Sequence, residues 1–179
     1  MKRIVSLSLF AAAALALAGC GSSKSHPMPM AMVVLTPTTN QTARGTVHFM
    51  EQKDGSVEVQ VDLQNVPPGI HGFHVHENPS CADDAKAAGG HFNPTAAPHA
   101  GPDAASHHAG DFGNVTADGA GNVKTTFTTR SITVHDGPAS VMSRSVVLHA
   151  QADDLTTQPS GNSGGRIACG VVQGMAGGM

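Results

Sequence analysis

Short stretches in which apolar and polar residues alternate restrict the fold of this chain more than any other feature. Residues 45–51 and 56–63 alternate in this way, and Lys53-Asp54-Gly55 between them is a hairpin signal. Because successive side chains of a strand point to opposite faces, a period of two predicts strands with one buried face. After residue 19 we find no convincing helical pattern.

Six further stretches complete the predicted set of eight strands: 32–36, 70–77, 112–116, 122–130, 145–150 and 166–173. The composition agrees, because a chain with no Trp, no Tyr, 21 Gly and 11 Pro suits short strands and tight turns better than a helical bundle. The predicted fold is all-β: an eight-stranded antiparallel Greek-key sandwich or barrel. Two long irregular segments, 78–111 and 151–165, interrupt it, and loops of such length are usually functional or disordered.

The first 19 residues are predicted to be a signal rather than part of the fold. Lys2 and Arg3 precede an apolar stretch, 4–18, that is too short to span a bilayer comfortably. The stretch ends in Leu17-Ala18-Gly19-Cys20, which resembles a bacterial lipoprotein signal, so that Cys20 would become the lipidated first residue. An ordinary secretory signal is the alternative, and it also exports the protein. We interpret residues 20–32 as a flexible tether and residues 33–176 as the folded domain.

Export simplifies the interpretation of the cysteines and of the charge. Once Cys20 carries lipid, Cys81 and Cys169 remain, and in an oxidising compartment one disulfide across 88 positions is the simplest reading. Without Lys2 and Arg3, 8 basic residues face 13 acidic ones, a formal net charge of −5. There is no basic patch to indicate nucleic acid as a partner.

Histidines provide the strongest functional signal, because ten of the eleven lie after residue 47. Imidazole is the commonest side-chain ligand for zinc and copper. His74 and His76 stand two residues apart on a predicted strand, so both project from one face and form a two-point metal clamp. An exposed surface pair is the alternative, and this spacing alone does not exclude it.

A second group lies in the segment 78–111. His91, His99, His108 and Asp111 offer three nitrogens and one carboxylate oxygen, which is the donor set of a closed tetrahedral Zn²⁺ site. A metal would also hold an irregular loop in shape. A solvated histidine-rich loop is the weaker interpretation, because a histidine pair precedes this segment and His149 follows it on another predicted strand.

Four motifs, in this order, resemble those of the copper/zinc superoxide dismutases. They are Gly72-Phe73-His74-Val75-His76-Glu77, then Gly90-His91-Phe92-Asn93-Pro94, then His108-x-x-Asp111-Phe112-Gly113-Asn114-Val115, and finally Gly161-Asn162-Ser163-Gly164-Gly165-Arg166-Ile167-Ala168-Cys169-Gly170. The resemblance covers residues 33–174. It implies an enzyme that converts superoxide to O₂ and H₂O₂ with copper and zinc as cofactors.

The resemblance also assigns the ligands. Copper would be bound by His74, His76, His91 and His149, and zinc by His91, His99, His108 and Asp111. His91 would therefore bridge both metals as an imidazolate and act as a proton carrier. Four imidazoles with an open position suit Cu²⁺, whereas Zn²⁺ has no redox chemistry and suits the closed site. The family's intrasubunit disulfide matches Cys81 and Cys169.

Two more residues take roles from the resemblance. Arg166 matches the family's active-site arginine, whose guanidinium attracts and hydrogen-bonds a small anion. Asp153 matches the carboxylate that links a copper histidine to a zinc histidine, with Asp154 next to it as the competing choice.

One segment departs from the family pattern. Residues 150–165 contain no Lys or Glu, although longer versions of this loop in the family carry charges that guide superoxide. Guidance would then come from elsewhere, for example from Lys86 or Arg144.

The remaining histidines and the tether have weaker signals. His71 matches a structural position of the family, and we expect no ligand role for His48, His107 or His135. In the tether, soft donors for Cu⁺ lead us to hypothesise weak copper capture, with a linker of chance methionines as the alternative. These donors are His26, Met28, Met30 and Met32.

The complete ligand set together with Arg166 favours a superoxide dismutase that protects the cell envelope. A non-catalytic copper- or zinc-binding lipoprotein on the same fold is the runner-up. A structural envelope protein would leave the histidines unexplained. We expect a lipid-anchored, periplasm-facing protein. Gly21 and Ser22 lack the Asp that retains lipoproteins at the inner membrane, so the outer membrane is slightly favoured in a Gram-negative cell. Monomer and homodimer both stay open, since bacterial members include both.

Overall fold

The computed structural model describes residues 28–175 and confirms the predicted all-β fold. Its main strands are β1 (Met30–Pro37), β2 (Arg44–Glu51), β3 (Val57–Gln64), β4 (Gly69–His76), β5 (Asp111–Ala117), β6 (Val123–Thr129), β7 (Ser145–His149) and β8 (Arg166–Val171). A two-residue strand, β9 (Gln173–Gly174), and a short 3₁₀ helix, η1 (Lys86–Ala88), complete the elements of the described part of the chain.

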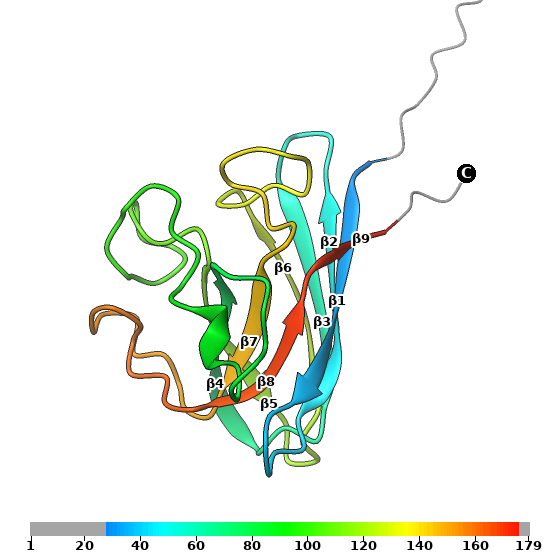
Figure 1. The fold of residues 1–179 in the computed structure, drawn as a ribbon, viewed down its shortest axis with the longest axis vertical. Helices are drawn as coiled ribbons and strands as arrows, with labels where there is room; N and C mark the ends of the chain where they lie inside the picture. Colours follow the sequence, from blue (N-terminus) through cyan, green and yellow to red (C-terminus); the bar gives the residue numbers. More distant parts are fainter. Residues whose placement is uncertain (1–27, 176–179) are drawn as a thin grey trace, which may run out of the picture.

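The strands form a nearly closed antiparallel barrel in the order β5-β4-β7-β8-β1-β2-β3-β6, and β9 pairs with β1 (Figure 1). One half contains β1, β2, β3 and β6, and the other contains β4, β5, β7 and β8. The end of β1 joins the halves where Thr36 pairs with Cys169 of β8. Strand β6 returns to lie beside β3 although β4 and β5 come between them in sequence, which is a Greek-key connection.

Alternation along β2 and β3 produces the core as the sequence predicts. Val47 and Phe49 of β2 and Val59 and Val61 of β3 are fully buried, while the residues between them are partly or wholly exposed. Burying one face of a strand against the opposite sheet stabilises the fold by about 1.5–3 kcal/mol for each large apolar side chain. The core lies mainly between the strands, and Phe92 and Ala109 of the long loop 77–110 also pack into it.

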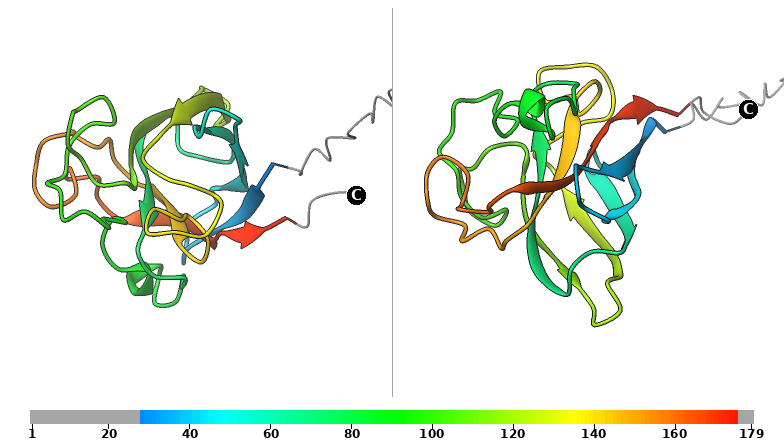
Figure 2. Two further views of the ribbon diagram at one scale, coloured as in Figure 1. Left: turned by 90° about the horizontal axis from the view of Figure 1, so that it is seen from above. Right: turned by 60° about the horizontal axis from the view of Figure 1, so that its bottom comes forward.

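Strands β4 and β7 differ, because both of their faces are buried. Phe73 and Val75 of β4 point into the core. His74 and His76 therefore project from the outer side of the barrel, yet they are 0% and 1% exposed. The long loops 77–110 and 150–165 lie together over this side, drawn in green and orange in both views of Figure 2. The loops turn an outer barrel face into a second, polar interior.

Two boundaries differ from the sequence prediction by more than one residue. Strand β1 begins at Met30, so the last three residues assigned to the 20–32 tether belong to the sheet, where Met30 pairs with Met50 and Met32 with His48. The predicted last strand, 166–173, is divided into β8 and β9, because the chain leaves β7 after Val171 and then pairs with β1.

The signal segment, Cys20 and His26 lie outside the described residues. Over residues 28–175, the structure contains no helix with the length and apolarity needed to cross a membrane.

Candidate metal centre

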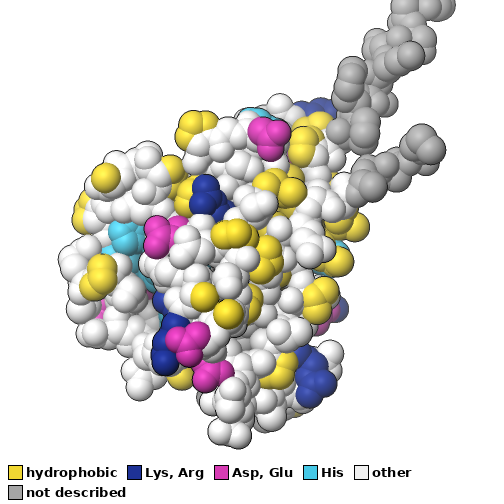
Figure 3. Space-filling view, viewed as in Figure 1, with side chains coloured by type: hydrophobic (Ala, Val, Ile, Leu, Met, Phe, Trp, Pro, Cys, Tyr) yellow, Lys and Arg dark blue, Asp and Glu magenta, His cyan; other side chains and the backbone are white. Residues whose placement is uncertain are grey.

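Six histidines and one aspartate converge in the polar interior beneath the two loops. The first group is His74, His76, His91 and His149, and the second is His91, His99, His108 and Asp111. Within each group the donor atoms all lie within 4.8 Å of one another. All seven side chains are buried, and Figure 3 shows only a small area of histidine surface on the side where the loops lie.

The first group joins strands to a loop. His74 and His76 come from β4, and His149 comes from the end of β7. His91 lies in the long loop, and its backbone pairs with that of His76 as an isolated antiparallel β-bridge. Nε2 of His76 and Nε2 of His149 are 3.3 Å apart. The ring centroids of His91 and His74 are 4.0 Å apart. The barrel thus fixes three of these imidazoles and the loop supplies the fourth.

The second group surrounds one carboxylate oxygen. Oδ1 of Asp111 lies 2.6 Å from Nδ1 of His91, 3.1 Å from Nδ1 of His99 and 3.2 Å from Nδ1 of His108. A tetrahedron with metal–ligand bonds of 2.0–2.1 Å has edges of about 3.3 Å. Because the two longer distances are close to this edge length, the four donors fit a tetrahedral zinc site.

Unpaired nitrogens provide an independent test of that fit. Four ring nitrogens are buried without a hydrogen-bond partner among the described residues: Nδ1 of His74, Nε2 of His91, Nδ1 of His99 and Nδ1 of His108. An unsatisfied buried polar atom costs about 1–3 kcal/mol, so a cluster of such atoms needs a physical reason. Metal coordination would satisfy all four. His91 presents Nδ1 to Asp111 and leaves Nε2 free, as a bridge between two metals requires.

Asp153 connects the two groups from behind. Its Oδ2 accepts a hydrogen bond from Nε2 of His74 at 2.7 Å, and its Oδ1 accepts one from Nε2 of His99 at 3.0 Å. These bonds fix which nitrogen of each ring faces a metal. Asp154 instead accepts hydrogen bonds from Thr156 and Thr157 at the surface, so the linking residue is Asp153.

Burial sets the protonation of the site. It lowers the pKa of His74 and His76 well below the ordinary value of 6.5, and the neighbouring histidines add to the effect. It also lowers the pKa of His149 to about 4. Burial would raise the pKa of Asp111, but hydrogen bonds from His91 and from the backbone N–H of Ala100 outweigh it and keep that pKa below its ordinary value. Neutral imidazoles and a carboxylate are the forms that bind metals.

A cleft of about 590 Å³ leads to the first group and is lined by His76, His91, His149 and Arg166, among others. Arg166 is the one Lys or Arg among the described residues that line it. Its guanidinium donates to the carbonyl of Ala85 and, at 2.6 Å, to the carbonyl of Gly89. The side chain is thereby held beside the histidines with its positive charge at the cleft.

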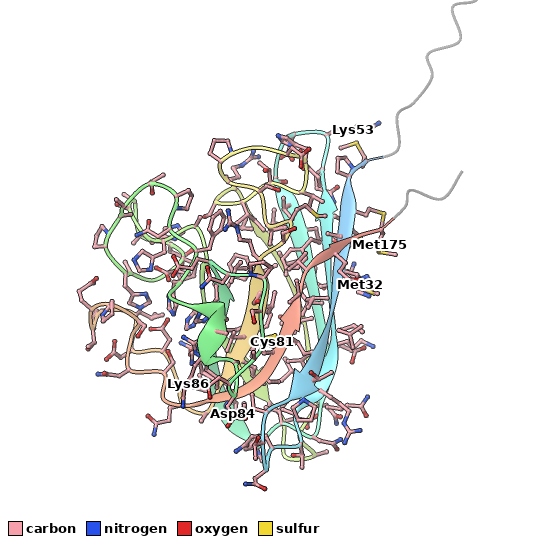
Figure 4. The ribbon with its side chains drawn as sticks, in the orientation of Figure 1. Met32, Lys53, Cys81, Asp84, Lys86 and Met175 are labelled. Atoms are coloured by element: carbon pink, nitrogen blue, oxygen red, sulfur yellow. A yellow bond between two sulfur atoms is a disulfide. The ribbon has the colours of Figure 1, made fainter. Side chains whose placement is uncertain are left out.

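The loop that holds Arg166 is fastened to β8. The predicted disulfide between Cys81 and Cys169 is present and has a Cα–Cα distance of 5.8 Å (Figure 4, where Cys81 lies beside β8). Gly89 also accepts a hydrogen bond from Nδ1 of His76 at 3.0 Å. With a φ of +79° it occupies the left-handed region that favours glycine, and an added Cβ would lie 2.5 Å from Oε1 of Glu77. One carbonyl therefore positions both His76 and Arg166.

The other predicted residues lie outside both metal groups. His71 is buried and contacts the carbonyls of Pro67 and His149, which agrees with a structural role. His107 and His135 also take no part in the metal groups. Arg144 stacks over Phe92 at 4.3 Å from the ring centroid and donates to the carbonyl of Glu77.

Neither suggested source of electrostatic guidance lines the cleft. Lys86 is exposed, and its Nζ lies 3.9 Å from Oδ1 of Asp83. The guanidinium of Arg144 is held between the ring of Phe92 and the carbonyl of Glu77.

Gly161 has a role at the site that was not predicted from the sequence, because it lies against Asp153 and His99. Its φ is +66°, and an added Cβ would lie 1.7 Å from Oδ1 of Asp153 and 2.7 Å from Nε2 of His99. Only a glycine lets the 150–165 loop approach the hydrogen bond between these two residues. The glycine-rich motif around it was the available signal.

Comparisons with known proteins agree with this geometry. The family model for copper/zinc superoxide dismutase (SODC) matches residues 43–172. A "Superoxide dismutase [Cu-Zn]" from Deinococcus radiodurans is 38% identical over 143 residues, which cover 72% of this chain and 76% of that protein. Among solved structures, the crystal structure of the clock protein EA4 matches with a TM-score of 0.74 and 36% identity, and covers 83% of this chain and 96% of that chain.

Proposed function

This chain belongs to the copper/zinc superoxide dismutase family, and we propose how its residues divide the work of dismutating superoxide to O₂ and H₂O₂. We assign copper to His74, His76, His91 and His149, and zinc to His91, His99, His108 and Asp111. The central observation is the position of His91, which belongs to both groups and has one nitrogen for each. Bound copper would supply the one-electron chemistry, taking an electron from one superoxide and giving it to the next.

Arg166 binds and orients the anion in this proposal. Superoxide is small and negative, and the protein around it has a net negative charge, so a local positive group must draw it in. A guanidinium held by two carbonyls keeps its remaining N–H groups directed consistently, which favours hydrogen bonding to a small anion. Electrostatic attraction of this kind raises association rates by about 10–1,000-fold.

His91 holds and moves a proton at Nε2. This atom has no hydrogen-bond partner among the described residues, and His91 lines the cleft, so a proton that Nε2 carries while it is not bound to copper can pass to a bound anion. Nδ1, which lies beside Asp111 and is assigned with it to zinc, would meanwhile keep the ring in place. Two protons are needed for each H₂O₂ formed, and His91 would deliver one of them while the second comes from solvent.

We further propose that the enzyme acts at the cell envelope, attached through lipid on Cys20. The support comes from the sequence Leu17-Ala18-Gly19-Cys20 and from the disulfide between Cys81 and Cys169, which suits an oxidising compartment. Radiolabelled palmitate incorporated into the wild-type chain and absent from Cys20→Ser would support the anchor. Equal labelling of both would contradict it. Sedimentation of the delipidated protein distinguishes a homodimer from a monomer.

Two substitutions test the assignment of roles. Metal content and superoxide decay are measured for His91→Ala and Arg166→Ala, with Lys86→Ala as the matched control, since Lys86 is a cation outside the cleft. We expect His91→Ala to lose activity. Arg166→Ala should keep both metals but react more slowly and with less dependence on ionic strength, while Lys86→Ala resembles wild type. Full activity in both cleft variants would refute the proposal.

A further inference from the structure

The outer face of β1 carries an array of sulfur and nitrogen donors that the active site does not use. Met30 and Met32 alternate with buried Ala31 and Val33, so their side chains point away from the core. On the neighbouring strand β2, Met50 lies opposite Met30 and His48 lies opposite Met32, and both side chains also point outward.

Strand β9 extends this array on the other side of β1. Gln173 pairs with Met32, and the N–H of Met175 donates to the carbonyl of Met30 at 3.0 Å, so Met175 continues the same register. The face therefore has one row of Met175, Met30 and Met50 and a second row of Gln173, Met32 and His48. Figure 4 shows Met32 and Met175 on the flank of β1 and β9, on the other side of the molecule from the loops.

The spacing allows these donors to meet at one point. Residues two apart on a strand are separated by about 6.8 Å, and opposed residues have Cβ atoms about 4.5–5.5 Å apart. The centre of the rectangle formed by Met30, Met32, Met50 and His48 is then about 4 Å from each Cβ. Methionine sulfur lies two bonds beyond Cβ and the side chain is flexible, so each thioether reaches that centre.

The residue types match a soft metal rather than ordinary strand packing. Strand positions favour β-branched and aromatic residues, and none of these methionines fills the core. Thioether and imidazole together select Cu⁺ over harder cations. His48 makes no hydrogen bond through its ring to any of the described residues, and Glu58, opposite Met50 on β3, places a negative charge at the end of one row.

We propose that Met30, Met32, Met50 and His48 form a surface site for Cu⁺, with Met175 as an additional donor. This role for His48 replaces the sequence-based expectation that it binds no metal, because only the strand pairing places it beside Met32. The site is separate from the buried histidines and does not depend on the roles assigned to them. It also places two methionines of the predicted copper-capturing tether on a strand beside partners from β2 that the local sequence could not reveal.

Residue-resolved NMR tests the site without reference to enzyme activity. The full chain, with Cys20→Ser so that no free thiol competes, is labelled at its methionine methyl groups and titrated with Cu⁺ anaerobically. We expect the Met30, Met32 and Met50 methyl signals to shift together, while Met142, which packs against the core, stays in place. Zn²⁺ should leave all of them unchanged.

Stoichiometry provides the second measurement. Competition with a chromophoric Cu⁺ chelator should give one more Cu⁺ per chain for the parent than for a variant with Met30→Leu, Met32→Leu and Met50→Leu, and Met142→Leu should match the parent. Leucine preserves volume, so the fold should persist. Unshifted methyl signals, equal stoichiometry, or an equal response to Zn²⁺ would each overturn the proposal.

Discussion

Replacement of Asp153 by Asn should affect copper binding and zinc binding differently, because it changes only one carboxylate oxygen into an NH₂ group. Oδ1 of Asp153 accepts hydrogen bonds from Nε2 of His99 at 3.0 Å and from the backbone N–H of Leu155 at 2.7 Å, while Oδ2 accepts only from Nε2 of His74 at 2.7 Å. An amide has one oxygen and one NH₂ group. The oxygen should take the Oδ1 position, where it serves two donors, and the NH₂ group would then face the N–H of His74.

The expected loss is therefore larger for copper than for zinc. A buried N–H left without an acceptor costs about 1–3 kcal/mol, which corresponds to about 5–150-fold in affinity. His74 is in the copper group and would bear this cost, whereas His99 in the zinc group keeps its acceptor. Loss of the charge weakens both hydrogen bonds, so we expect a smaller decrease for zinc as well.

Chelator competition for each metal measures this difference. Asp154→Asn is the matched control, because Asp154 is adjacent in sequence but bonds to surface residues. The control should keep both affinities within about twofold, since its hydrogen bonds lie outside the site. If Asp153→Asn weakened zinc more than copper, or neither metal, the role deduced for Asp153 would be wrong.

Three further predictions concern the loops and the metal-free fold. Gly161→Ala should lower zinc affinity about 10–100-fold, because the added Cβ would displace Oδ1 of Asp153 from Nε2 of His99, a proposed zinc ligand. Gly165→Ala, where a Cβ meets nothing within 4 Å, should leave zinc affinity unchanged, and equal zinc titrations for the two variants would disprove the crowding argument. Replacing Cys81 and Cys169 together by Ser should lower the free energy of unfolding, measured by urea denaturation, by about 4.5 kcal/mol on the chain-entropy model. It should also slow superoxide decay, because the loop that holds Arg166 loosens. An unchanged rate of superoxide decay would show that the disulfide is not needed to hold this loop. For metal-free protein, the folded pKa of His149 near 4 lies below its unfolded value of 6.5, so the unfolded state binds more protons between these values. The contribution of the neutral His149 ring to the free energy of unfolding, about 3 kcal/mol, is complete above pH 6.5 and is lost as the pH falls toward 4. A urea midpoint that does not change over this pH range would contradict the burial of a neutral His149 ring.

The strands and the ligands could be predicted from sequence for different physical reasons. Alternation on β2 and β3 reports burial of one face directly, because each residue's position relative to the core follows from its parity. The proposed ligands could be picked out because metal binding demands particular donor types, and the donor atoms of His91, His99, His108 and Asp111 do lie together in the structure.

What could not be predicted depends on contacts between distant segments. Spacing did not separate Asp153 from Asp154, since the choice depends on which side chain turns inward. The carbonyl of Gly89 that holds both His76 and Arg166 is a backbone atom with no signature in the residue types. The start of β1 at Met30 is set by pairing with Met50 of β2, because methionine itself has little preference for strands.

The two faces of β4 have a consequence for how the enzyme matures. Phe73 and Val75 build the barrel core on one face, and no metal is needed there, while His74 and His76 face the loops on the other. The barrel core can therefore form without metal, and the metals can enter afterwards on a face that the core does not use. Synthesis and activation are separable steps, so a cell could hold a reserve of folded, inactive protein and adjust the amount of working enzyme through its supply of copper and zinc.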